Sequence, residues 1–170
     1  MIKLHFYEDD KDICSIKGIG DSSPGHDYLL VLLRFFLENS KDGFVVARRN
    51  NFDLTSLMQK IQIEKLLCEI DCLQYSDDQF ELSFTFHAEK RREELVYLLE
   101  RIWFSYEQPV FCFYEAGING DRNDVDFRLI EKLSWKQIIS HYNGFVFFRS
   151  AEDDVLWIGK SQSQFFNLPA

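Results

Sequence analysis

The sequence has little of what marks a secreted or membrane-spanning protein. It contains four cysteines, three prolines and eight glycines in 170 residues. Its first residues reach an acidic side chain at Glu8 without a long apolar stretch, which argues against a secretory signal. The most apolar run, residues 28–37, is interrupted by Arg34 and is far shorter than the roughly 20 residues of a membrane-spanning helix. We therefore expect a cytosolic protein without a membrane segment.

The cysteines do not form a recognisable metal or disulfide framework. They are scattered among apolar residues, which is typical of buried, reduced thiols in a cytosolic protein, and they are Cys14, Cys68, Cys72 and Cys112. Cys68 and Cys72 lie in a segment whose alternation predicts a strand, where four residues span about 13 Å. That distance is too long for two ligands of one metal ion, so we expect core thiols.

Motifs for other ligands are incomplete. The segment that begins at Asp121 resembles the start of a calcium loop, but its sixth position is Asp126 instead of glycine and its twelfth is Lys132 instead of glutamate. Residues 18–20 supply only the first half of a dinucleotide-binding glycine motif, and Ser23 occupies the place of the third glycine. The sequence therefore predicts no metal site and no cofactor.

Catalytic signatures are also missing. The chain has four histidines, no nucleophile elbow and no cysteine in a catalytic local motif. Carboxylates are so abundant that no single pair stands out. A small hydrolase that uses a carboxylate together with a histidine such as His87 or His141 is therefore kept as an alternative, but we expect a protein that is not an enzyme.

Acidic residues are what the chain has in excess. It carries 28 Asp and Glu against 19 Lys and Arg, a net charge of −9 and a pI near 4.9. Because 46% of the residues are hydrophobic and 16% are aromatic, this is the composition of a folded domain and not of a disordered acidic tail. Such a charge repels nucleic acid and anionic membranes and attracts basic proteins. We expect a basic protein partner.

Much of the acid lies in short clusters beside aromatic residues. Carboxylates steer a basic partner and rigid aromatic rings anchor it, so these clusters form our predicted partner-binding surface. The alternative is that they are solvated turns that only keep the protein soluble. The predicted partner-binding residues are Asp9, Asp10, Tyr75, Asp77, Asp78, Asp121, Asp124, Asp126, Glu152, Asp153, Asp154 and Trp157.

Periodicity predicts one domain over residues 1–170 that mixes strands and helices. We expect an α+β fold, a mostly antiparallel sheet of about six or seven strands with three or four packed helices. Two hairpins are predicted, one turning at 76–78 and one at 150–154. Strands are expected near 2–8, 44–47, 66–73, 80–86, 110–114, 145–149 and 155–159. Helices are expected from Ser23 to Asp42–Gly43, and over 53–60, 88–105 and 134–142 with Ser134 as a cap.

The C-terminal region carries a resemblance to a known class of proteins. The run from Asn143 to Arg149, followed by the segment from Asp153 to Lys160, is similar to the closing hairpin of bacterial immunity proteins. These belong to contact-dependent growth inhibition and related polymorphic toxin systems, and the chain resembles them in length, acidity and Phe content. The resemblance implies a one-to-one inhibitor of a cognate protein toxin, commonly a nuclease with a basic cleft. A non-catalytic adaptor domain that assembles through a sheet edge is the further alternative.

Overall fold

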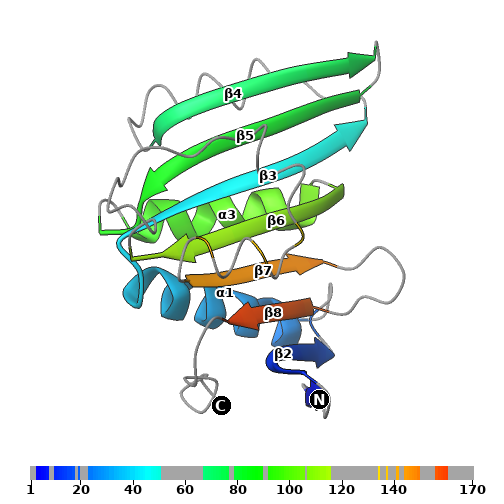
Figure 1. Cartoon of the computed structure of the whole chain (residues 1–170), viewed down its shortest axis with the longest axis vertical. Helices are drawn as coiled ribbons and strands as arrows, with labels where there is room; N and C mark the ends of the chain where they lie inside the picture. The colour runs from blue at the N-terminus through cyan, green and yellow to red at the C-terminus, as the bar shows by residue number, and fades with distance from the viewer. Residues whose placement is uncertain are drawn as a thin grey trace.

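The computed structural model describes residues 3–7, 10–17, 19, 23–50, 67–76, 79–89, 92–105, 107–115, 134, 137, 141, 144–149 and 156–160. These residues form one antiparallel sheet with two helices packed on it, so the α+β class is confirmed. The helices α1 (Ser23–Glu38) and α3 (Arg92–Ser105) lie together on one face of the sheet (Figure 1). Neither described helix is long and apolar enough to cross a membrane.

The sheet has eight described strands, all paired antiparallel. Their order across the sheet is β1-β2-β8-β7-β6-β3-β5-β4 (Figure 1). The strands are β1 (Lys3–Tyr7), β2 (Asp10–Lys17), β3 (Asp42–Asn50), β4 (Leu67–Ser76), β5 (Gln79–His87), β6 (Glu107–Tyr114), β7 (Gly144–Arg149) and β8 (Leu156–Lys160). Both predicted hairpins, β4–β5 and β7–β8, are confirmed.

One strand was missed by the sequence analysis. No strand was expected between residues 8 and 44, but residues 10–17 form β2, which pairs with β1 on one side and β8 on the other. Its first three residues are charged, so the local pattern is weak. Cys14 and Ile16 are nonetheless fully buried, which indicates that packing against the rest of the fold stabilises this strand.

Helix α1 ends earlier than expected. It stops at Glu38, whereas Asp42 and Gly43 are the first residues of β3. The amide of Asn39 and the hydroxyl of Ser40 donate hydrogen bonds of 2.8 and 2.7 Å to backbone carbonyls of the last turn. The same carbonyls, those of Phe35 and Phe36, also accept the backbone N–H of Asn39 at 3.1 and 3.2 Å, so the two side chains add a second hydrogen bond to each carbonyl at the helix end.

Gly43 is required by packing across the sheet. A Cβ atom at this position would lie 2.3 Å from Cζ of Phe86 and 2.6 Å from the carbonyl oxygen of Cys112. The absence of a side chain therefore makes room for the Phe86 ring of β5. The glycine that was interpreted as a helix stop is instead part of the core.

Strand β6 begins before its proline. It starts at Glu107, two residues ahead of Pro109, although the strand was expected only from Val110. Val46 pairs with Val110 and Arg48 with Glu107, so one residue of β3 faces two of β6. Proline has no amide hydrogen to donate, and a bulge of this kind is one of the few places where an interior strand accepts it.

Two further predicted helices fall mostly or wholly outside the described residues. That over 53–60 lies entirely outside them. For the helix over 134–142, the cap at Ser134 is described: its amide donates to Oε1 of Gln137 at 2.8 Å, and its Oγ accepts from the amide of Gln137 at 3.4 Å. This reciprocal arrangement is a capping box, which confirms Ser134 as the cap.

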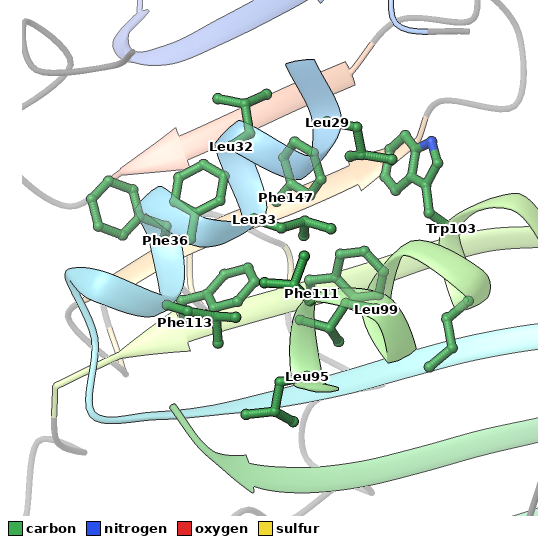
Figure 2. Close-up of a cluster of buried hydrophobic side chains, with 14 of the residues drawn as sticks. Leu29, Leu32, Leu33, Phe36, Leu95, Leu99, Trp103, Phe111, Phe113 and Phe147 are labelled. Carbon is green, nitrogen blue, oxygen red and sulfur yellow. The ribbon is translucent and has the colours of Figure 1, made fainter. Parts of the chain in front are cut away.

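The main core lies between the two helices and the middle of the sheet (Figure 2). Both apolar stripes expected on the helices are confirmed, since Leu29, Leu32, Leu33, Phe36, Leu37, Leu95, Leu98, Leu99, Ile102 and Trp103 are all buried. The Phe36 ring lies between sheet rings, with centroids 5.2 Å from Phe113, 5.1 Å from Phe145 and 5.4 Å from Phe147. On the other helix, Trp103 stacks on Phe147 at 4.9 Å.

The opposite face of the central strands is buried as well. Phe44, Cys112, Tyr114 and Val146 alternate with the residues that face the helices, and none is more than 1% exposed. Successive strand residues point to opposite faces, so burial on both faces requires continuous apolar runs. The run from Phe145 to Phe148 and the start of β3 have this pattern.

The Phe36 ring gives a direct test of this core. We expect Phe36→Ala to lower the free energy of unfolding by about 3–5 kcal/mol, because it removes a fully buried ring that contacts both the sheet and its own helix. Urea denaturation followed by circular dichroism measures the change. The matched control is Val31→Ala on the same helix, where the side chain is 41% exposed and the expected change is within about 0.5 kcal/mol. Equal losses in the two variants would contradict the packing.

Candidate functional site

Three of the predicted partner-binding residues fall within the described strands. Asp10 begins β2, Tyr75 lies near the end of β4 and Trp157 lies in β8. The other nine are outside the described residues and stay predictions: Asp9, Asp77, Asp78, Asp121, Asp124, Asp126, Glu152, Asp153 and Asp154.

The strand order keeps the two predicted aromatic anchors apart. Tyr75 is on the outermost strand β4, and Trp157 is five strand positions away on β8. With strands about 4.8 Å apart, this separates their backbones by about 24 Å. Asp10 lies five residues along β2 from Ser15, which pairs with Trp157, a distance of about 17 Å. The predicted clusters therefore do not converge on one small site.

The β4–β5 hairpin concentrates the negative charge. Residues 67–87 hold five carboxylates, Glu69, Asp71, Asp77, Asp78 and Glu81, and no Lys or Arg, for a net charge of −5. That is more than half of the −9 of the whole chain, on 21 of its 170 residues. At the other edge, residues 3–17 hold four carboxylates and three lysines, for a net charge of −1. We call residues 67–87 the acidic edge hairpin.

The register of this hairpin follows the alternation seen in the sequence. Ile70 pairs with Phe84 and Cys72 with Leu82, while Asp71 pairs with Ser83 and Leu73 with Glu81. Two of these pairs join apolar residues, whereas the other two each set a carboxylate opposite an uncharged residue. The register shifts on either side of this stretch, between Leu67 and Ile70 and between Gln74 and Ser76.

A second polar feature joins β3 to β5. Nδ1 of His87 lies 2.7 Å from Oδ1 of Asp42, at positions that are directly paired in the two strands. Asp42 is only 4% exposed, whereas one third of the His87 side chain is exposed. The second carboxylate oxygen, Oδ2, is buried and has no hydrogen-bond partner in the described structure. Among the described residues, the hydrogen bond with His87 is therefore the one that the carboxylate of Asp42 makes.

Backbone hydrogen bonds surround the pair. The amide of Lys41 donates to the carbonyl of Tyr114 at 3.1 Å, and the amide of Ala88 donates to the carbonyl of Lys41 at 2.8 Å. The segment that enters β3 is thereby fixed to the end of β6 and to the segment that leaves β5. The Asp42–His87 pair lies where three chain segments meet, which is the position of a structural junction.

The junction has part of what catalysis by an acid–histidine pair needs. The carboxylate can orient the imidazole, but catalysis also requires a nucleophile within hydrogen-bond reach of the imidazole. Cys112 pairs with Phe44 two residues from Asp42, yet its thiol is fully buried, and the loss of solvation raises its pKa well above the usual value. A thiol that stays protonated is a poor nucleophile. Among the described residues, no three His, Cys, Asp or Glu side chains are grouped to hold a metal ion.

The outer surface of the helix pair carries two cross-helix contacts. The guanidinium of Arg34 donates to both carboxylate oxygens of Glu93 at 3.3 and 3.1 Å, and His26 pairs with Glu100. The hydrogen bond from Arg34 lowers the pKa of Glu93, and the same bond raises that of Arg34. The two pairs show that α1 and α3 run antiparallel. Because both pairs are at least partly exposed, each contributes little to the free energy of folding.

Some of these residues were missed by the sequence analysis. Asp42 was assigned to a helix end, and nothing local marks it as a buried strand residue. Tyr97, which is 55% exposed, is an aromatic residue outside the apolar stripe of α3, and that off-stripe position was a usable signal. Glu69 and Glu81 were not among the predicted partner-binding residues. The absence of Lys and Arg from residues 67–87 is the sequence signal that distinguishes them.

No family model, no curated protein and no solved structure matches the chain. No catalytic family is therefore assigned to it by similarity.

The junction is tested by removing each partner of the pair. We expect Asp42→Ala to cost about 1–3 kcal/mol, and His87→Ala to cost more, about 3–5 kcal/mol, because it leaves a buried carboxylate without its hydrogen bond. Urea denaturation of both single variants and the double variant gives their coupling energy. A coupling of about 0.5–3 kcal/mol is expected, and simple additivity would show that the pair does not act as a unit.

The buried thiol predicts a loss of stability at alkaline pH. The pKa of Cys112 is raised in the folded state, so above about pH 8.5 the unfolded chain loses this proton while the folded protein keeps it. Stability therefore falls as pH rises past that value. Unfolding free energies between about pH 7 and pH 10 should show this slope, and Cys112→Ala should reduce it. An unchanged slope in the variant would mean that other groups cause it.

Proposed function

We propose that the protein is an inhibitory binding protein of the immunity type, which neutralises one cognate basic toxin in a one-to-one complex. The observation that carries the proposal is the uneven distribution of charge. Strands β4 and β5, at one edge of the described sheet, hold Glu69, Asp71 and Glu81 and no Lys or Arg, and the sequence between them adds Asp77 and Asp78. A folded domain that concentrates charge in this way presents a field directed at partners of the opposite sign.

The field would act mainly on the rate at which the complex forms. Complementary charge raises association rates from about 10⁵–10⁶ M⁻¹s⁻¹ toward 10⁸–10⁹ M⁻¹s⁻¹ at low salt. Speed matters for an inhibitor of a toxin that acts as soon as it is free. Buried aromatic contacts would then set how long the complex lasts, and Tyr75 of β4 is the residue that we propose provides one.

The cytosol is the compartment we infer for this activity. Cys14 and Cys112 are buried thiols that are not joined in a disulfide bond, as expected in a reducing environment. A nuclease toxin would act on nucleic acid in the same compartment. Its substrate-binding cleft would be basic, because it has to hold phosphates, and it would thus be complementary to an acidic inhibitor.

Co-expression tests the proposal. The probe is the C-terminal domain encoded by the gene immediately upstream, expressed in a bacterial host with and without this chain. We expect growth to stop with the domain alone and to resume when the chain is present. For the purified pair, the association rate should fall at least tenfold between about 50 mM and about 500 mM salt, because salt screens the attraction.

Asp42→Asn separates this proposal from the hydrolase alternative. The substitution keeps the shape of the side chain but removes the carboxylate that an acid–histidine pair needs. An inhibitor that acts by binding should protect growth as well with this substitution as without it. Loss of protection by a folded Asp42→Asn protein would favour catalysis, and failure of the unaltered chain to protect would contradict the immunity function.

A further inference from the structure

We draw no further inference here: the strongest candidate, the outer surface of helices α1 and α3, where the side chains of Val31 and Tyr97 are exposed, carries no docking proposal because nothing in the structure shows what covers it.

Discussion

The contact between the Phe36 ring and the sheet is the interaction on which the other parts of the fold depend. This ring lies against Phe113 of β6 and against Phe145 and Phe147 of β7, which places α1 over the centre of the sheet. Trp103 of α3 stacks on the same Phe147. The two helices are therefore located by one pair of neighbouring strands, and their mutual contacts follow from that placement.

Most of this arrangement could be predicted from the sequence, because the apolar residues repeat with the periods of helices and strands. The apolar stripes indicated helices α1 and α3 and their buried faces, and the alternation of apolar and polar residues indicated strands β4 and β5. What could not be predicted depends on contacts between distant residues. Strand β2 has too few apolar residues to be predicted from its own sequence. Asp42 is recognised as a strand residue only from its pairing with His87, which is 45 residues away.

The candidate site shows the same division. The aromatic and acidic clusters were visible in the sequence, but their separation was not, since nothing local indicates that β8 lies between β2 and β7. Strand order places Tyr75 and Trp157 in different parts of the sheet. It also leaves the most acidic of the described strand pairs, β4 and β5, at an edge of the described sheet.

The position of β8 has a consequence for the order in which the protein is assembled during synthesis. Strands β1 and β2 are synthesised before the other described strands, but among these strands their only link to the rest of the sheet is β8, which is synthesised after all the others. The β3–β6 portion can form while the chain is still growing, and the N-terminal hairpin has to wait for the C-terminal strand. Pairing between strands so far apart in sequence is slow, because the intervening chain must first be closed into a loop. Completion of the sheet thus waits for β8, and a chain without β8 would leave β1 and β2 without the strand on which they dock.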